Sequence, residues 1–196
     1  MGKNTAASFL LLTVLVLLIG NSWTATLEGQ LNSDDIVTLT EKIVPFVSTP
    51  QEIVEKMLEM AQVREGDVLY DLGSGDGRIV ITAAKKYGIR AVGFEIDPKL
   101  VQRSRDSIRE EGLGHLVEIR QQNIFTVDLS PATVLTLYLL PQVNLILRPN
   151  IQKQLRPGSR VVSHDFDMNG WSPHMVEQVK DSGGAYHMLY FWQIED

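Results

Sequence analysis

The stretch Asp71-Leu72-Gly73-Ser74-Gly75-Asp76-Gly77-Arg78 decides the fold of this chain. It follows the apolar run Val68 to Leu72, which is typical of a buried strand, and it precedes a helical pattern from Ile79 to Tyr87. The three glycines let the backbone turn tightly and approach a ligand where any β-carbon would collide. A strand, a glycine-rich loop and a helix in this order predict a nucleoside-binding α/β unit.

Two acidic side chains sharpen this prediction. Glu95 ends the second expected strand, Ala91 to Ile96, where a carboxylate is placed to accept hydrogen bonds from ribose hydroxyls. Asp71 puts another carboxylate beside the glycine-rich loop. That carboxylate suits a ligand whose near end carries an ammonium group and suits a pyrophosphate poorly. The pattern therefore points away from NAD.

Helical and strand patterns alternate through the rest of the chain, which predicts a parallel sheet covered by helices. Further helices are expected over Gln51 to Ala61, Pro98 to Glu111 and Asn144 to Leu155. Further strands are expected over Leu116 to Arg120, Thr133 to Leu139 and Arg160 to Phe166. The segments Met175 to Lys180 and Tyr186 to Ile194 flank Asp181-Ser182-Gly183-Gly184 and predict a terminal hairpin.

The composition narrows the function classes. A chain of 196 residues that is 44% hydrophobic fits one catalytic domain. A formal net charge of -6 gives no general attraction to a phosphate backbone, so we do not expect nucleic acid as the substrate. The chain has no cysteine, which excludes a disulfide framework, a thiolate metal site and a cysteine nucleophile.

The N-terminus has the order of a secretory signal: Lys3, the apolar run Phe9 to Ile19, then the small polar stretch Gly20 to Ser22. The run is shorter than the roughly 20 residues that span a bilayer, which favours a cleaved signal over a permanent transmembrane helix and leaves an anchor open.

This pattern predicts three regions: a signal peptide or short membrane anchor over 1–26, a linker over 27–42, and the catalytic domain over 43–196. We accordingly expect the protein to be exported or membrane-associated. If translation starts further downstream, we expect it to be cytoplasmic instead.

From about Pro45 to the C-terminus the sequence resembles class I S-adenosylmethionine-dependent methyltransferases, whose first motif is similar to Asp71 to Gly77. The resemblance implies S-adenosylmethionine as cofactor and a Rossmann-like seven-stranded sheet with helices on both faces and an antiparallel last strand. It also implies that Glu95 binds the ribose, that Ile96 lies against the adenine, and that Gln122-Asn123-Ile124 lies at the adenine edge.

A closer resemblance rests on Pro45-Phe46-Val47-Ser48-Thr49-Pro50 and on Gly93-Phe94-Glu95 followed by Pro98. These residues resemble the mitochondrial lysine methyltransferases that act on the ATP synthase c-subunit and the adenine nucleotide carrier, together with small bacterial relatives. In that subgroup the first stretch lies over the cofactor; a plain helix-entry turn is the alternative. The candidate cofactor-binding residues are thus Val47, Thr49, Asp71, Gly73, Ser74, Gly75, Gly77, Glu95, Ile96, Asn123 and Ile124.

Fewer residues indicate the methyl acceptor. Tyr138-Leu139-Leu140-Pro141 stands where amino-methylating relatives place an Asn/Asp-Pro-Pro-aromatic motif, but it lacks the leading Asn or Asp. The remaining candidate catalytic residues are Tyr138 and Asn144, together with His164 at the end of the fifth strand, as a general base or as a hydrogen-bonded structural histidine.

No metal site is expected. His164, Asp165 and Asp167 offer ligand atoms, but alternation along a strand turns neighbouring side chains apart.

Three functions remain open. The first is a protein-lysine methyltransferase with a lysine side chain as acceptor, which the subgroup resemblance implies. The second is a methyltransferase for a small molecule or lipid, which the N-terminal segment and the missing Asn or Asp favour. The third is a non-catalytic cofactor-binding module.

Overall fold

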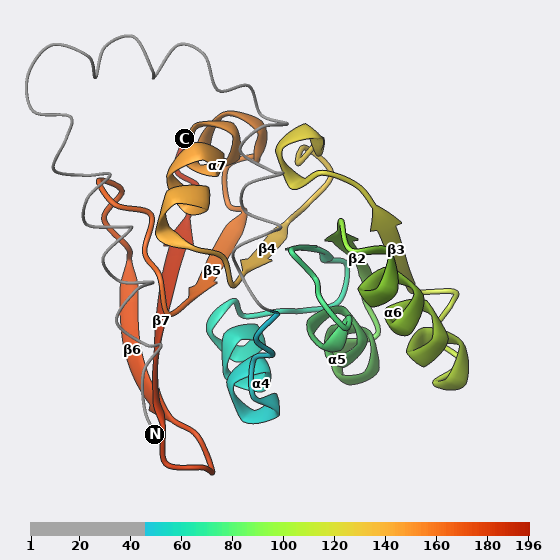
Figure 1. The fold of residues 1–196 in the computed structure, drawn as a ribbon. Helices are drawn as coiled ribbons and strands as arrows, with labels where there is room; N and C mark the ends of the chain where they lie inside the picture. The colour runs from blue at the N-terminus through green and yellow to red at the C-terminus, as the bar shows by residue number, and fades with distance from the viewer. Residues whose placement is uncertain (1–45) are drawn as a thin grey trace, which may run out of the picture. The chain divides into compact units, whose positions relative to one another are not determined.

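The fold is built on a seven-stranded sheet with the strand order β3-β2-β1-β4-β5-β7-β6 (Figure 1). The computed structural model describes residues 46–196. The strands are β1 (Val68–Leu72), β2 (Arg90–Glu95), β3 (Val117–Gln121), β4 (Val134–Leu137), β5 (Arg160–His164), β6 (Met175–Lys180) and β7 (Tyr186–Gln193). Strands β1 to β5 pair in parallel, and β7 runs antiparallel to both β5 and β6. The expected seven-stranded sheet with a reversed last strand is confirmed, as is the terminal hairpin.

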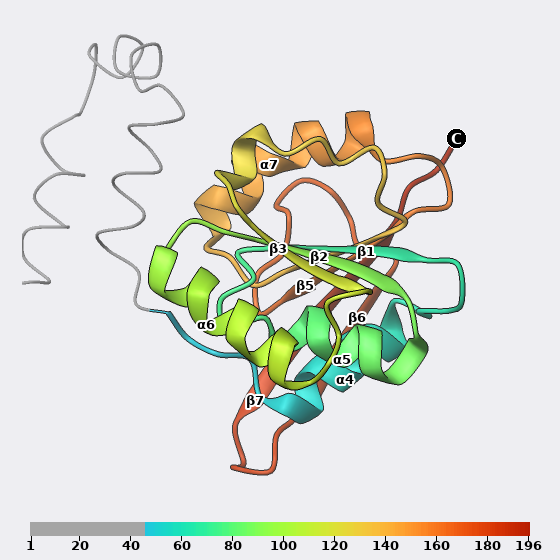
Figure 2. The ribbon, with the colours of Figure 1, turned by 90° about the vertical axis from the view of Figure 1, so that its right-hand side faces the viewer.

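Helices cover both faces of the sheet, as Figure 2 shows. Helices α4 (Gln51–Met60), α5 (Arg78–Tyr87) and α6 (Pro98–Glu110) lie on one face, and α7 (Pro141–Gln154) lies on the other. A short 3₁₀ helix, η1 (Ile124–Thr126), follows β3. These positions confirm the predicted α/β class.

Most element boundaries agree with the predicted ones to within one residue, but β5 ends at His164 instead of Phe166, and two boundaries near Pro141 also differ. Strand β4 ends at Leu137 instead of Leu139, and α7 begins at Pro141 instead of Asn144. The physical reason is Pro141, because its fixed φ and missing N–H suit the first turn of a helix. The chain therefore leaves the sheet earlier, and Tyr138 lies in the connection between β4 and α7.

Each face of the sheet has its own apolar core, because side chains alternate along the strands. In β1, Leu69 packs with α4, α5 and α6, whereas Tyr70 and Leu72 pack with the cluster that includes α7. Asp71 has the same parity as Leu69 and so points to the face that carries the glycine-rich loop and α5. The alternation explains how an otherwise apolar strand accommodates one charged residue.

The prediction of export or membrane association needs correction. Within residues 46–196, none of the helices combines the length and the apolar character needed to cross a membrane. The hydrophobic run 9–19 and the regions predicted over 1–26 and 27–42 lie outside the described residues. We therefore withdraw the predicted localisation.

Candidate active site

The glycine-rich loop joins β1 to α5 at the carboxyl edge of the parallel strands. Gly73, Gly75 and Gly77 have φ angles of 75°, 56° and 80°, in the left-handed region that favours glycine. A β-carbon at Gly73 would lie 2.7 Å from Leu139 Cδ2, and one at Gly75 would lie 2.2 Å from Phe46 Cε2. The loop thus needs glycine both for its backbone conformation and for close packing.

Asp71 is buried beside this loop, with 2% of its surface exposed. The register of β1 and β4 places it opposite Thr136, whose Oγ1 donates a hydrogen bond of 2.8 Å to Asp71 Oδ1. Burial raises the pKa of Asp71 to about 7, although the hydrogen bond from Thr136 opposes the shift. Since a nearby cation favours the ionised form, this carboxyl is suited to receive a positively charged ligand group.

Glu95 lies on the other side of the loop and is fixed by backbone donors. The Gly75 N–H donates to Glu95 Oε2 at 2.8 Å, and the N–H groups of Ile96 and Asp97 donate to Oε1 at 2.8 and 3.0 Å. Oε1 thus already accepts two hydrogen bonds, whereas Oε2 accepts one and keeps acceptor capacity for a hydroxyl donor. Asp71 and Glu95 therefore flank the loop as two oriented acceptors.

Arg78 connects the glycine-rich loop to the segment before α4. Its Nε and Nη2 donate to the two carboxylate oxygens of Asp76 at 2.9 and 2.6 Å, and its Nη1 donates to the Thr49 carbonyl at 2.6 Å. Burial favours the neutral acid, but the hydrogen bonds and charge of Arg78 hold the pKa of Asp76 below its usual value. This clamp was not predicted from the sequence, which gives no sign that Arg78 and the Thr49 carbonyl meet.

The other expected cofactor residues lie around the loop. Asn123 Oδ1 accepts a hydrogen bond from the Phe125 N–H and so caps η1, while Ile124 packs against the core on the α7 face. Val47 is 60% exposed. The Ser74 side chain is buried, and a β-carbon on the neighbouring strand at Gly93 would lie 2.3 Å from Ser74 Oγ. The Ser74 N–H donates to the Phe94 carbonyl and the Ser74 carbonyl accepts from the Gly77 N–H, both at 2.9 Å, so this residue holds the loop against β2.

Tyr138, the first candidate on the acceptor side, lies just beyond β4. Its hydroxyl donates to Asp165 Oδ2 at 3.2 Å, and its ring centroid lies 3.9 Å from that of His164. Burial and the negative charge of Asp165 raise the pKa of Tyr138, so the phenol stays protonated at neutral pH. The structure thus brings Tyr138 and His164 together.

Asn144, the second candidate, is fully buried. Its Nδ2 donates to the carbonyls of Asp167 and Phe166 at 3.1 and 3.2 Å, and it lies 3.4 Å from Ser163 Oγ. The amide therefore holds the loop that follows β5. A direct contact between Asn144 and the acceptor stays a prediction, and the geometry favours this supporting role.

His164, the third candidate, ends β5 with none of its surface exposed. Its Nδ1 lies 3.1 Å from Thr49 Oγ1, and its Nε2 lies 2.9 Å from His187 Nδ1. Burial lowers the pKa of His164 to about 4, which makes it a neutral imidazole at physiological pH. His187 lies on β7 and was not identified from the sequence, because the pairing of β5 with β7 leaves no local pattern.

Comparisons with known sequences agree with this geometry. The sequence profile of the ANTKMT methyltransferase domain matches residues 71–175. A protein-lysine N-methyltransferase of Saccharolobus islandicus is 45% identical over 77% of this chain and 94% of that protein. The human lysine N-methyltransferase of the ATP synthase c-subunit is 34% identical over 78% of this chain, which spans 65% of the human protein.

Solved structures agree on the fold and on the cofactor. The crystal structure of an RNA methyltransferase from Salinibacter ruber in complex with S-adenosyl-L-homocysteine is 54% identical, with a TM-score of 0.71 over 76% of this chain and 95% of that chain. TrmN from Thermus thermophilus, at 16% identity and a TM-score of 0.65 over 76% of this chain and 50% of that chain, shows likeness of fold alone.

The family expected from the glycine motif and from the segment before α4 is confirmed, as is the cofactor. The chain therefore belongs to the ANTKMT methyltransferase domain family and is a class I S-adenosylmethionine-dependent methyltransferase.

Proposed function

We propose that this enzyme methylates the ε-amino group of a lysine side chain in a protein. The observation that carries the proposal is a glycine-rich loop between two oriented carboxylates, Asp71 and Glu95, in a chain 45% identical to a protein-lysine N-methyltransferase. The match spans 94% of that relative's length.

The described residues fit the cofactor. Asp71 offers an anion for an ammonium group, Glu95 Oε2 offers an acceptor for a ribose hydroxyl, and the glycines give the loop between them its left-handed turns. We assign the remaining contacts to the predicted residues Val47, Thr49, Ser74, Ile96, Asn123 and Ile124. When bound, the cofactor would supply a sulfonium methyl group for in-line attack by an amine nitrogen, with the neutral thioether S-adenosylhomocysteine as the leaving group.

The protein has to align the acceptor and keep its nitrogen neutral, since in-line displacement depends on positioning. We assign the positioning to Tyr138, because its hydroxyl stays protonated and lies in the connection after β4. Asn144 supports the neighbouring loop through its buried amide. We assign no general base here.

The test is transfer of labelled methyl from S-adenosylmethionine by the full chain into protein, RNA and lipid fractions, followed by acid hydrolysis and mass spectrometry of methyl-lysine. We expect methyl-lysine in the protein fraction and its loss in Glu95→Gln. Label confined to lipid or small molecules would contradict the lysine acceptor. Binding of S-adenosylmethionine without transfer to any fraction would favour a non-catalytic module.

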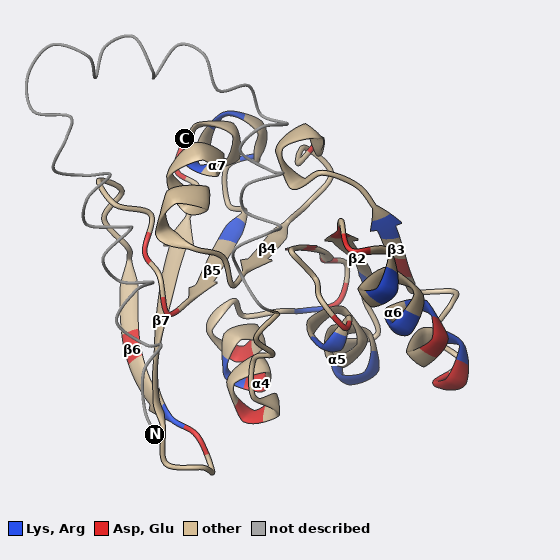
Figure 3. Ribbon diagram, viewed as in Figure 1, with Lys and Arg blue, Asp and Glu red and all other residues tan. Residues whose placement is uncertain are grey.

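An RNA acceptor is the second candidate, because a structure 54% identical to this chain is that of an RNA methyltransferase. Charge argues against it. Figure 3 shows blue segments on α5 and α6, but acidic side chains accompany several of these cations: Lys85 pairs with Glu111 at 2.9 Å, and Lys86 pairs with Glu59 at 3.2 Å. The formal net charge is -6. Label found in RNA in the same assay would reverse the ranking.

A further inference from the structure

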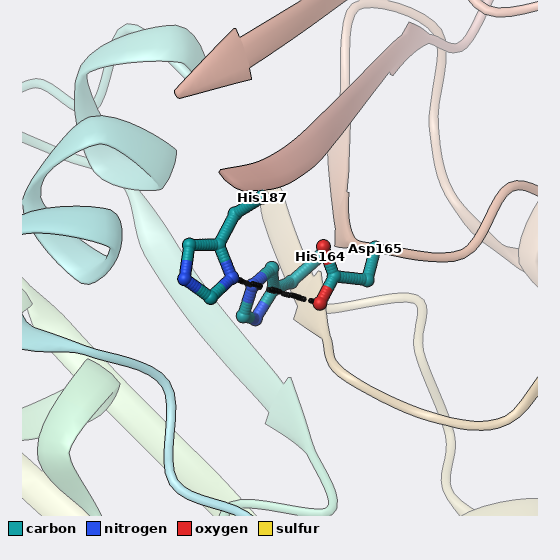
Figure 4. A group of neighbouring side chains, drawn as sticks. All are labelled: His164, Asp165 and His187. Carbon is teal, nitrogen blue, oxygen red and sulfur yellow. Dashed lines mark hydrogen bonds and ion pairs between the residues drawn. The ribbon is translucent and has the colours of Figure 1, made fainter. Parts of the chain in front are cut away.

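Three side chains meet at the carboxyl end of β5: His164, Asp165 and His187 (Figure 4). Their facing atoms are His164 Nε2, His187 Nδ1 and Asp165 Oδ2. The two nitrogens lie 2.9 Å apart, and the oxygen lies 3.4 Å from His164 Nε2 and 3.6 Å from His187 Nδ1. The three atoms therefore form a triangle with sides between 2.9 and 3.6 Å.

The backbone explains why they meet. Antiparallel pairing places His164 opposite Leu189, so His187 is the next residue along β7 on the same face of the sheet. Strand alternation alone would turn Asp165 away from His164. However, Asp165 has a φ of 60°, which ends the extended backbone and lets its carboxylate approach both histidines. Because of this turn, strand alternation does not separate His164 from Asp165, and His187 is a third candidate ligand that the sequence did not indicate.

We propose that His164, Asp165 and His187 form a binding site for a divalent transition metal ion of the zinc type. Zinc bonds of about 2.0–2.1 Å in tetrahedral geometry place ligand atoms about 3.3–3.4 Å apart. The three observed separations, 2.9, 3.4 and 3.6 Å, lie on both sides of that value. Two imidazoles and one carboxylate are a donor set that zinc takes with a fourth position left for water.

The outward-facing atoms of all three groups have partners. His164 Nδ1 lies 3.1 Å from Thr49 Oγ1, and His187 Nε2 lies 3.3 Å from Asp181 Oδ2. A ring N–H at each outer nitrogen leaves an unprotonated nitrogen facing inward, as metal-bound histidines require. Asp165 Oδ1 accepts a hydrogen bond from the Met188 N–H at 2.9 Å, which orients its carboxylate.

Charge and access also fit. Two carboxylates, the ligand Asp165 and the outer partner Asp181, balance the charge of a divalent ion beside two neutral rings. His164 is fully buried, but Asp165 and His187 keep 26% and 13% of their side-chain surface exposed, so an ion can enter from their side. In this arrangement His164 Nε2 binds metal and is not available as a general base.

A hydrogen bond between the two rings is the competing arrangement, with His164 Nε2–H donating to His187 Nδ1. In that arrangement Thr49 Oγ1 has to donate to His164 Nδ1, and Asp165 does not contribute to the contact between the two rings. The metal uses all three groups at once.

The experiment is titration of the purified full chain with Co²⁺ after removal of metal by a chelator, followed by displacement with Zn²⁺. We expect one equivalent of Co²⁺ with the intense visible absorption of a four-coordinate ion, which Zn²⁺ then abolishes. We expect His187→Ala and Asp165→Asn to lose this spectrum. Asp181→Asn should weaken binding about 10- to 100-fold, the usual effect of losing an outer partner.

The matched control is His174→Ala, which removes another histidine with an acidic neighbour, Glu195, at 3.2 Å outside the cluster. It should bind Co²⁺ as the wild type does. Circular dichroism checks the fold of each variant, and Asp165→Asn serves if His187→Ala does not fold. A folded wild type that binds no Co²⁺, gives only a six-coordinate spectrum, or binds equally after Asp165→Asn would leave the hydrogen bond between the rings as the correct arrangement.

Discussion

Asp71 is a buried carboxyl with a pKa of about 7, so both its protonated and its ionised form are populated near physiological pH. An aspartate in an unfolded chain releases its proton near pH 4, so between about pH 4 and 7 the folded state holds a proton that the unfolded state has lost. This group therefore lowers the stability of the cofactor-free protein as pH rises through that window, and the loss is complete above pH 7.

Replacement of Asp71 by asparagine should remove this pH-dependent cost. We expect Asp71→Asn to raise the unfolding free energy of the cofactor-free protein at pH 8 by on the order of a few kcal/mol, since one pKa unit corresponds to about 1.4 kcal/mol. The difference should shrink towards pH 4. Denaturant unfolding at both pH values measures it, and a variant less stable than wild type at pH 8 would contradict the assignment.

Cofactor binding should show the same titration. If an ammonium group of S-adenosylmethionine pairs with ionised Asp71, binding releases a proton wherever the free protein holds one. We expect affinity to rise as the pH rises towards about 7, by up to about tenfold per pH unit. Calorimetry in two buffers of different ionisation enthalpy counts the released protons. Asp71→Asn is the control, because its affinity for S-adenosylmethionine should not change with pH over this range.

A comparison of Gly75 with Gly88 distinguishes two reasons for glycine in the loop, the left-handed backbone conformation and the lack of space for a β-carbon. Alanine at Gly75 meets both a φ of 56° and the Phe46 ring, whereas alanine at Gly88 meets a φ of 64° and nothing within 4 Å. We expect Gly88→Ala to cost about 1–2 kcal/mol of stability and to keep cofactor affinity. Gly75→Ala should also displace Phe46 and reduce affinity at least tenfold, measured by calorimetry. Equal affinities in the two variants would count against close packing at Gly75.

At this scale the sequence predicted the residues that carry a local signature. Asp71 and Glu95 follow from the motif because each lies at the end of a strand next to a tight turn. His187 could not be predicted, since its partners His164 and Asp165 come from another strand through antiparallel pairing and a left-handed backbone.

Among the elements, α4 is joined to the strands by a buried ion pair. Arg160 on β5 pairs with Asp67 just before β1, and its Nη1 donates to the carbonyls of Ala61 and Gln62 at the end of α4, at 3.1 and 2.9 Å. Both charged side chains are less than a tenth exposed. No sequence pattern indicates this pair, because neither residue belongs to a motif.

Breaking that pair should destabilise the fold strongly. We expect Asp67→Ala to lower the unfolding free energy by about 3–5 kcal/mol, because it leaves Arg160 charged and buried without its partner. Glu59→Ala removes an exposed pair with Lys86, 3.2 Å long, and should change it by less than about 1 kcal/mol. Urea unfolding measures both free energies. Similar losses in the two variants would show that the buried Arg160–Asp67 pair contributes no more to stability than an exposed pair does.

The boundaries of β4 and α7 differ from the predicted ones because Pro141 determines where the helix begins. Periodicity located β4 and α7, but it could not say that the helix starts at Pro141 and that Tyr138 falls between the two elements. Tyr138 owes its contact with Asp165 to that early exit from the sheet.

On the scale of the whole molecule, the alternation of strand and helix patterns was enough to predict an α/β class with a mainly parallel sheet. The seven-stranded sheet with its reversed last strand came from the resemblance, because pairing between distant segments leaves no periodic signal. The localisation prediction was wrong because it depended on the N-terminal run alone.

Net charge makes a testable statement about the acceptor. With a formal charge of -6, the full chain should show no measurable affinity for single-stranded RNA at physiological salt in fluorescence anisotropy. A basic RNA-binding domain of similar size serves as the positive control. Micromolar binding that falls steeply with salt would instead favour an RNA acceptor.

The reversed strand β7 has an evolutionary consequence. Because it runs against its neighbours, it delivers His187 beside the end of β5, on a strand that takes no part in the glycine-rich loop. Substitutions on β7 and changes in the length of the β6–β7 turn can therefore alter the proposed acceptor side while β1, β2 and the glycine-rich loop stay unchanged. Proteins with this sheet can therefore diverge in acceptor specificity while the residues around the methyl donor stay the same.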